Sequence, residues 1–250
     1  MNMSKVASEL SLSFLGENIE GLLERLKNSP EKGMEWWLKH ELENLHNRRF
    51  ERRIKESRLG VFRGITDFDW DWPDKIDKPG LRHLLKGDFL SDHSNIIMIG
   101  PEGVGKTMLA KNLAYLAIQK GFRARFVNAA QLTNDLGAFV PGPSKERAFT
   151  RYTGPHVLVI DEIGYVNYDS AAAVDLFEVI SRRYEKSPTI VTSNLGFSDW
   201  GRFFPDIGCA ASLIDRLLHH SRILEIEGKS YRLREHEQNR KALKEACVDE

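Results

Sequence analysis

The fold is decided by residues 96–107, which read Ile96-Ile97-Met98-Ile99-Gly100-Pro101-Glu102-Gly103-Val104-Gly105-Lys106-Thr107. The run from Ile96 to Ile99 is wholly apolar, as in a strand that is buried in a parallel sheet. The run from Gly100 to Thr107 has the spacing Gly, any four residues, Gly-Lys-Thr, and its glycines let backbone N–H groups converge on a phosphate. The residues that follow have helical periodicity, so a positive helix end faces the same phosphate. We therefore predict a phosphate-binding loop at residues 100–107 rather than an ordinary glycine-rich turn.

Two side chains of this loop carry its chemistry. Lys106 supplies a positive charge for the β- and γ-phosphates of a nucleotide, and the Thr107 hydroxyl is a ligand for Mg²⁺. A second half-site follows the apolar run at residues 157–160, where Asp161 and Glu162 are adjacent. Ligands of parallel sheets bind at the carboxyl ends of the strands, so both half-sites face one site. We expect Asp161 to hold Mg²⁺ through water and Glu162 to orient and deprotonate an attacking water; the alternative is a strand that ends in solvated acids.

Residues 61–250 have the alternating pattern of an α/β domain. Short apolar strands are predicted at residues 96–99, 125–127, 157–160, 189–192 and 223–226, with helical segments between them. The pattern predicts a three-layer α/β domain with a five-stranded parallel sheet. Too few residues follow the last strand to form a C-terminal helical lid domain. Residues 1–60 precede this domain, and their apolar spacing predicts a small helical domain that is broken at Asn28-Ser29-Pro30.

Composition favours a folded, soluble chain. Hydrophobic residues make up 41% and charged residues 29% of the 250 residues, which excludes intrinsic disorder as the main state. No apolar run approaches the ~18 residues of a membrane span and no signal peptide is evident, so we expect a cytoplasmic protein with no membrane partner. Cys209 and Cys247 are too few for a disulfide framework or a cysteine-rich zinc site. The formal net charge is zero, so any nucleic acid must bind to a local patch.

The chain resembles the AAA+ ATPases once the stretch Thr189-Ile190-Val191-Thr192-Ser193-Asn194 is added to the two half-sites. The resemblance implies that ATP is the nucleotide. It also implies that Asn194 is a sensor, which hydrogen-bonds the γ-phosphate or the attacking water. The alternative is an asparagine that simply ends a strand in a turn.

Further stretches resemble the IstB group, the ATP-binding helper proteins of a bacterial insertion-sequence family. They are Asp161-Glu162-Ile163-Gly164-Tyr165, Ser193-Asn194-Leu195-Gly196-Phe197-Ser198-Asp199-Trp200, Asp215-Arg216-Leu217-Leu218-His219-His220 and Gly228-Lys229-Ser230-Tyr231-Arg232. The group is similar to the DnaC helicase loaders and the DnaA initiator ATPases. The resemblance covers about residues 60–240. It implies a homo-oligomer that holds ATP between its subunits, assembles on duplex DNA and presents target DNA to a partner transposase.

Two arginines acquire roles through this resemblance. Arg216 matches the arginine finger that reaches the γ-phosphate of the neighbouring subunit, where a planar and permanently charged group suits a transferring phosphoryl group. Arg232 matches the second sensor, which in the wider AAA+ family rests on the C-terminal lid that is missing from this chain. A surface salt bridge is the alternative for both arginines.

Two segments are candidates for DNA contact. One is the basic second half of a predicted helix, and the other lies at residues 143–152, where initiator-type AAA+ proteins carry a DNA-contacting insertion. The candidates are Arg48, Arg49, Arg52, Arg53, Lys145 and Arg147. Contacts to phosphates need only such side chains, without base readout. A solvated charged face is the alternative for each segment.

Two rival functions stand beside the ATP-dependent transposition helper. A DnaC-like replicative helicase loader shares nearly all of the nucleotide chemistry and differs in the partner of its N-terminal domain. A nucleotide-gated DNA-binding scaffold with little turnover is the other rival, and it has no need of Glu162.

His219 and His220 are adjacent histidines on a predicted helix. Neighbouring residues of a helix point in different directions. No third ligand is evident in the sequence, so we expect no zinc site here.

Overall fold

The computed structural model describes residues 6–7, 10–165 and 167–246 of the chain, and Cys247 lies outside them. The chain divides into two compact units, Met1–Lys55 and Glu56–Glu250, and each is described by itself. No described helix has both the length and the apolar character that crossing a bilayer requires.

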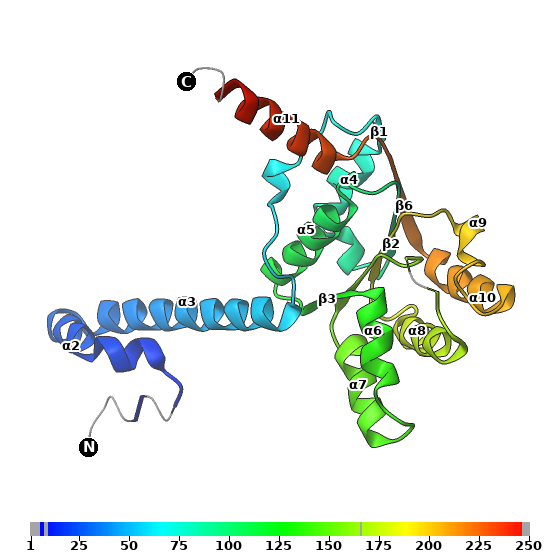
Figure 1. The fold of residues 1–250 in the computed structure, drawn as a ribbon. Helices are drawn as coiled ribbons and strands as arrows, with labels where there is room; N and C mark the ends of the chain where they lie inside the picture. The colour runs from blue at the N-terminus through cyan, green and yellow to red at the C-terminus, as the bar shows by residue number, and fades with distance from the viewer. Residues whose placement is uncertain (1–5, 8–9, 166, 247–250) are drawn as a thin grey trace. The chain divides into compact units, whose positions relative to one another are not determined.

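The first unit is a helical hairpin, which confirms the predicted break (Figure 1). Helix α2 spans Ser13–Asn28, and helix α3 spans Pro30–Ser57, so its last residues belong to the second unit. Pro30 opens α3, a position where its missing N–H costs no helical hydrogen bond. A Cβ at Gly33 would lie 3.0 Å from the backbone nitrogen of Leu26, so a glycine allows the two helices to approach closely.

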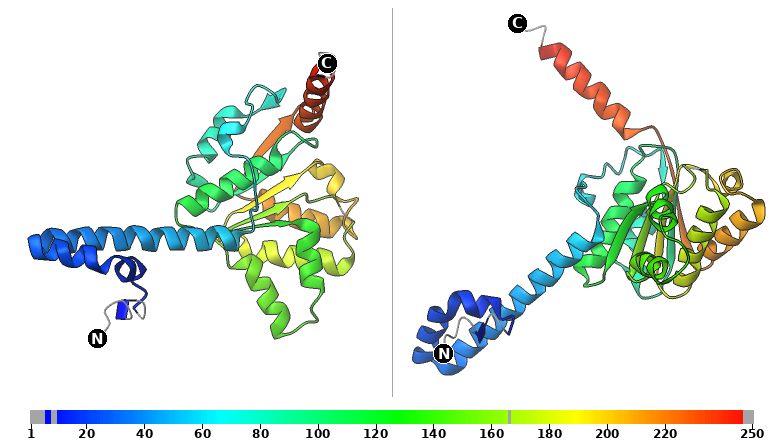
Figure 2. Two further views of the ribbon diagram at one scale, coloured as in Figure 1. Left: turned by 60° about the vertical axis from the view of Figure 1, so that its left-hand side comes forward. Right: turned by 60° about the horizontal axis from the view of Figure 1, so that its bottom comes forward.

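The second unit contains a mostly parallel sheet between two layers of helices (Figures 1 and 2). The strands are β1 (Lys75–Ile76), β2 (Asn95–Ile99), β3 (Ala124–Asn128), β4 (Val157–Asp161), β5 (Thr189–Ser193) and β6 (Ser221–Glu227). The helices are α4 (Lys78–Leu84), α5 (Lys106–Gln119), α6 (Ala129–Gly137), α7 (Pro143–Thr153), α8 (Ser170–Arg183), α9 (Phe197–Trp200), α10 (Ile207–Leu218) and α11 (Tyr231–Ala246). Two short 3-10 helices lie at Ile65–Asp67 and Asp88–Leu90.

The sheet has the strand order β1-β6-β2-β5-β4-β3. Strands β2 to β6 are parallel, which confirms the five predicted parallel strands. The predicted strand number is nevertheless one too small, because β1 adds a sixth strand that pairs antiparallel with β6. Strand β1 has two residues, and so short a segment has no detectable periodicity in the sequence.

Helices cover both faces of the sheet, as predicted for a three-layer domain (Figure 2). Helix α5 packs on one face against β3, β4 and β5. Helices α6, α8 and α10 pack on the other face, where Leu132, Leu176 and Leu213 are fully buried in one apolar cluster. Strand β4 is buried along its whole length, which explains why its sequence is continuously apolar rather than alternating.

One buried cation joins the end of α8 to the start of two strands. The side chain of Arg183 is 2% exposed, and burial lowers its pKa. Its guanidinium donates hydrogen bonds to the carbonyl oxygens of Tyr152, Pro155, His156 and Pro188 and to the Thr189 hydroxyl, at 2.7–3.2 Å. The acceptors lie in the chain segments that lead into β4 and β5, so this side chain aligns the amino ends of both strands.

We predict that Arg183→Leu lowers the free energy of unfolding by about 3 kcal/mol or more, because it leaves several buried carbonyl oxygens without donors. Denaturant titration followed by circular dichroism measures the loss. The matched control is Arg182→Leu. Arg182 is the preceding residue; it forms surface ion pairs with Glu146 and Glu178, and its guanidinium lies 4.6 Å from the centre of the Phe149 ring, so its removal is expected to cost only about 1 kcal/mol. Equal losses for the two variants would contradict the role given to Arg183.

Candidate nucleotide-binding site

A cavity of about 560 Å³ lies at the carboxyl edge of the parallel sheet in the second unit. Four parts of the chain line it. They are the phosphate loop (residues 100–107), the residues that follow β4 and β5, the strap (residues 63–73) and the first turns of α11. The two half-sites predicted from the sequence therefore do share one cavity.

Glycines of the phosphate loop stand where a Cβ does not fit, among them Gly103 and Gly105 beside the cavity. Gly103 and Gly105 have φ values of +76° and +100°, which are unfavourable for residues with a Cβ. A Cβ at Gly103 would collide with the hydroxyl of Ser230, just before α11, and one at Gly105 would lie 2.7 Å from the Phe68 ring. The loop is thus packed tightly between the strap and α11, with its backbone close to the cavity.

Lys106 is poised for an anion. Its side chain is buried, and Nζ donates hydrogen bonds of 2.7 Å to the carbonyl oxygens of Gly100 and Pro101. Burial lowers the pKa of Lys106, although nearby carboxylates, Asp161 first among them, oppose the shift. A phosphate bound at the loop would offer the Lys106 ammonium group a negatively charged acceptor in place of these two neutral carbonyl oxygens. Lys106 is therefore suited to bind a nucleotide phosphate.

Oxygen atoms suited to Mg²⁺ meet beside Lys106. The Thr107 hydroxyl donates to the two carboxylate oxygens of Asp161 at 3.0 and 3.1 Å. The Thr192 hydroxyl, from β5, donates to the same carboxylate at 2.5 Å. Hydroxyl and carboxylate oxygens are the hard ligands that Mg²⁺ prefers. Thr107 and Asp161 would hold it, and it would then offset phosphate charge.

Glu162 points away from Asp161 although the two are adjacent. Its φ is +60°, and its backbone N–H donates to the Thr192 hydroxyl at 2.9 Å. Its carboxylate accepts a hydrogen bond of 2.6 Å from Nδ2 of Asn128 at the end of β3. The side-chain oxygen Oδ1 of Asn128 caps α6 by accepting from the N–H of Ala130, which leaves Nδ2 directed at Glu162. Asn128 therefore holds Glu162 at the mouth of the cavity.

Two further predicted residues also line the cavity. Asn194 follows β5, which lies between β2 and β4 in the sheet, so Asn194 stands between the phosphate loop and the acidic pair. Arg232 lies in the first turn of α11 and is exposed to the cavity. Helix α11 follows β6 and carries this arginine to the cavity.

Arg216 is not among the described residues that line the cavity. It lies near the end of α10, and its guanidinium is 4.1 Å from the centre of the Phe177 ring on α8. It therefore does not reach the nucleotide cavity of its own chain.

The sequence did not reveal the residues on the far side of the cavity. Phe68 and Trp72 of the strap and Tyr231 of α11 offer aromatic surfaces that a nucleotide base can contact. Arg234 stacks on Trp72 at 4.4 Å and pairs with Asp69 at 2.8 Å. The aromatic run at residues 68–72 predicts a docked segment, and this is confirmed, but only the structure shows where it docks. Sequence patterns also did not single out Asn128 and Thr192 as site residues. Their position as polar residues at the ends of predicted strands was the signal that could have identified them.

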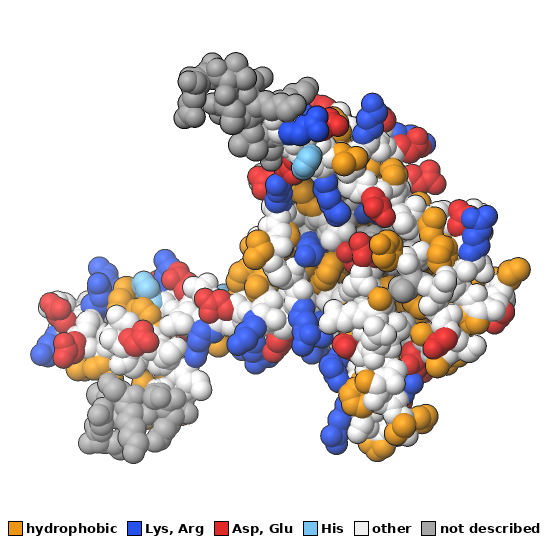
Figure 3. Space-filling model, in the orientation of Figure 1, with side chains coloured by type: hydrophobic (Ala, Val, Ile, Leu, Met, Phe, Trp, Pro, Cys, Tyr) orange, Lys and Arg blue, Asp and Glu red, His pale blue; other side chains and the backbone are white. Residues whose placement is uncertain are grey.

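The residues predicted to contact DNA lie outside the cavity. Figure 3 shows Lys and Arg side chains along the second half of α3, where Arg49 is exposed. Arg48 donates to the Ser11 carbonyl oxygen at 3.0 Å, and Arg52 and Arg53 follow on the same helix. In the second unit, Arg147 on α7 is exposed, whereas Lys145 is 2.7 Å from the buried carboxylate of Asp175. That ion pair gives Lys145 a structural role within the second unit.

Comparison with known proteins agrees with this site. A model of the family described as IstB-like ATP-binding proteins matches residues 7–239. The chain is 37% identical over 231 residues to the ATP-binding protein of insertion sequence IS21 from Pseudomonas aeruginosa, covering 91% of this chain and 87% of that protein. It is 41% identical over 182 residues to the corresponding protein of insertion sequence IS5376 from Geobacillus stearothermophilus, covering 73% of this chain and 72% of that protein.

The fold also has relatives among solved structures. The crystal structure of the DnaC helicase loader aligns with a TM-score of 0.52 over 70% of this chain and 99% of that chain, at 18% identity. At this identity the match speaks for the fold alone. The second unit accordingly has the same fold as the DnaC helicase loader structure.

Proposed function

We propose that this chain, which belongs to the family of IstB-like ATP-binding proteins, is an ATP-dependent helper of DNA transposition. It binds ATP with Mg²⁺, assembles on duplex DNA, hydrolyses ATP and regulates or recruits a partner transposase. The observation that carries the proposal is that Lys106, Thr107, Glu162 and Asn194 line one cavity, with Asp161 hydrogen-bonded to Thr107 beside it. Insertion-sequence relatives supply the transposition context.

The proposal gives Glu162 the role of general base. Its carboxylate lines the cavity next to the phosphate loop and can take a proton from a water that attacks the γ-phosphate. Asn128 is a positioning residue, because its hydrogen bond sets where that carboxylate stands. A scaffold without turnover has no use for an acid held in this way, so the geometry favours an ATPase over that rival.

We predict that Glu162→Gln retains ATP binding and slows hydrolysis by about 10²–10⁴-fold, the usual contribution of a general base. The amide keeps the shape of the side chain and loses its proton affinity. Phosphate release and binding of a fluorescent ATP analogue measure the two effects separately. The control is Glu225→Gln, an exposed carboxylate on β6 that does not line the cavity. Turnover at the wild-type rate in Glu162→Gln would remove this residue from the mechanism.

The proposal also includes a homo-oligomer with ATP between its subunits. Arg216 supports it, because this arginine lies outside the cavity of its own chain and stands partly exposed near the end of α10. The guanidinium of Arg216 is permanently charged, and at this position it can contact the nucleotide of a neighbouring subunit.

We predict that Arg216→Ala binds ATP normally as a dilute monomer and loses hydrolysis by about 10³-fold or more, as for an arginine finger supplied in trans. Lys106→Ala, in contrast, loses ATP binding itself. Each variant is inactive alone, but a mixture forms interfaces with one intact pocket and one intact finger. The mixture should therefore recover part of the ATPase activity, provided that the Lys106 variant still enters mixed assemblies. Loss of ATP affinity in dilute Arg216→Ala would place the arginine in cis and overturn the assignment.

DNA contact is proposed for the basic half of α3 in the first unit, with Arg147 of the second unit as an additional candidate. Arg48, Arg49, Arg52 and Arg53 lie within two turns of one helix. Side chains of this kind neutralise phosphates without reading bases, which suits a helper that accepts many target sequences.

We predict that replacing Arg49, Arg52 and Arg53 with Ala weakens binding to all duplex sequences alike. The slope of log K against log salt should flatten by up to about 0.9 for each phosphate that the variant no longer neutralises. Fluorescence anisotropy at several salt concentrations measures the slope, and ATP affinity of the free chain should not change. The matched control replaces Lys27, Lys32 and Lys39, three exposed cations of the same unit. If both triple variants flatten the slope equally, the contact surface is not this half of α3.

The DnaC-like fold keeps a replicative helicase loader as the second candidate. The two functions share the nucleotide cavity and differ in the protein that the first unit engages. An adjacent transposase reading frame, together with binding of its purified product to the full chain, would decide for transposition. Binding to the replicative helicase instead would decide for the loader.

A further inference from the structure

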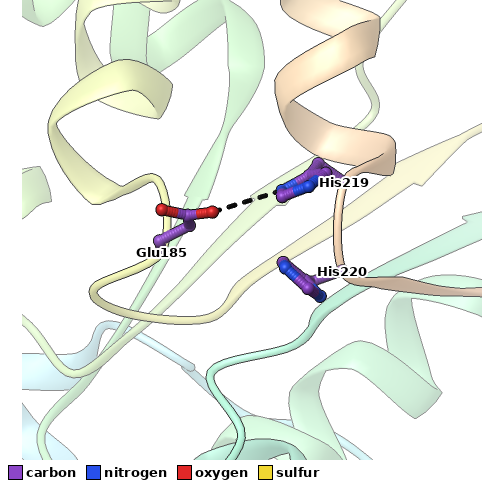
Figure 4. A group of neighbouring side chains, drawn as sticks. All are labelled: Glu185, His219 and His220. Carbon is purple, nitrogen blue, oxygen red and sulfur yellow. Dashed lines mark ion pairs between the residues drawn. The ribbon is translucent and has the colours of Figure 1, made fainter.

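Three potential metal ligands meet at the edge of the sheet opposite the nucleotide cavity (Figure 4). Glu185 lies in the loop between α8 and β5, and His219 and His220 lie in the turn between α10 and β6. Both β5 and β6 run parallel to β2, so the turns that precede them lie at the amino edge of the sheet. The cluster is therefore separate from the Mg²⁺ site proposed above.

The histidines differ from the sequence expectation in two respects. Helix α10 ends at Leu218, so His219 and His220 lie beyond the helix and their rings come within 4.1 Å of each other. His220 has a φ of +54°, which is outside the helical range. The third ligand, Glu185, is distant in sequence and could not be recognised there. The structure therefore supplies a third potential ligand that the sequence did not indicate.

The donor atoms are close enough for one cation. One donor atom from each of the three residues lies within 4.8 Å of the others, and Nδ1 of His219 is 3.4 Å from the Glu185 carboxylate. Tetrahedral zinc ligands, each about 2.0–2.2 Å from the metal, are about 3.5 Å from one another. The side chains are exposed, so small rotations about their χ angles bring the donors together without moving the backbone.

The two turns are held in place by one buried residue, Asn95 at the start of β2. Its side-chain oxygen accepts from the N–H of Thr189, shortly after Glu185, and its Nδ2 donates to the carbonyl oxygen of Leu217. Its backbone N–H donates to the carbonyl oxygen of His220 at 3.0 Å. The ligand-bearing segments are thereby fixed relative to each other before any ion arrives, which lowers the ordering cost of binding.

The ring of His219 is oriented as well. The Tyr184 hydroxyl lies 2.7 Å from its Nδ1, and the two rings are 5.5 Å apart. This contact sets the direction of the ring. Because it uses Nδ1, an ion binds either at the free Nε2 or at Nδ1 in place of the tyrosine hydroxyl.

We propose that Glu185, His219 and His220 form a site for a divalent transition cation of the Zn²⁺ class, with an open position for water or a further ligand. Two imidazole nitrogens and one carboxylate oxygen suit Zn²⁺, Co²⁺, Ni²⁺ or Cu²⁺, whereas Mg²⁺ and Ca²⁺ prefer oxygen ligands alone. A bound ion joins the α8–β5 loop to the α10–β6 turn, and Arg216 lies three residues before His219 on the same segment.

The test uses the tag-free full chain, freed of metal by a chelator and dialysed, without nucleotide or Mg²⁺. Zn²⁺ is titrated by calorimetry, and Co²⁺ by its visible absorption. Wild-type chain should bind one equivalent at this site, and Zn²⁺ should raise its melting temperature. The double variant His219→Ala, His220→Ala and the single variant Glu185→Gln should bind at least 10-fold more weakly and lose the thermal shift.

His83→Ala is the matched control. His83 pairs with Asp88 at 2.9 Å with side-chain exposures of 48% and 47%, close to the 48% and 54% of His219 and Glu185. Yet His83 belongs to no group of three donors among the described residues. It should bind Zn²⁺ like wild type. Equal affinity in wild type and the double variant would overturn the proposal, as would equal weakening in His83→Ala. Glu185→Gln changes an exposed group and keeps the test valid if the double variant folds poorly; ATP binding in each variant reports separately on the nucleotide site.

Discussion

The buried carboxylate of Asp161 organises the carboxyl edge of the sheet. It is 5% exposed, and a buried carboxylate is tolerated only when donors satisfy it. The donors are the hydroxyls of Thr107 and Thr192, so the start of α5 and the carboxyl ends of β4 and β5 must lie together. The Thr192 oxygen also accepts the N–H of Glu162, which holds that residue in an unfavourable φ region and turns its side chain towards Asn128. The Thr192 hydroxyl thus holds the adjacent residues Asp161 and Glu162 in different positions.

At the amino edge of the same sheet, buried polar groups are likewise satisfied by hydrogen bonds. Arg183 satisfies the carbonyl oxygens of the segments that enter β4 and β5, and Asn95 joins the segments that enter β5 and β6. Buried polar side chains at this edge replace the backbone partners that strand ends lack. Both edges are therefore rigid, and turns that carry exposed groups, such as Glu185 and His219, are held at defined positions.

Local patterns in the sequence account for the phosphate loop, Asp161 and the five parallel strands. Each of these rests on residues that are adjacent or regularly spaced, and buried parallel strands leave continuous apolar runs. Asn128, Thr192 and Glu185 act through neighbours that are 30 or more residues away in the chain. No spacing rule reports such pairs. The short strand β1 and the docking of the strap beside the phosphate loop also depend on tertiary contacts, so the sequence indicated neither partner.

Helix α11 closes one side of the nucleotide cavity. The N–H of Tyr231 donates to the carbonyl oxygen of Gly103, so the helix begins directly on the phosphate loop. Ion pairs from Arg63 to Glu235 and from Arg234 to Asp69 then join α11 to the strap. These local attachments place Arg232, in the first turn of α11, at the cavity. Exposed ion pairs add little stability in water, so the contacts of Trp72 with Arg234 and with the Tyr231 ring also hold α11 against the strap.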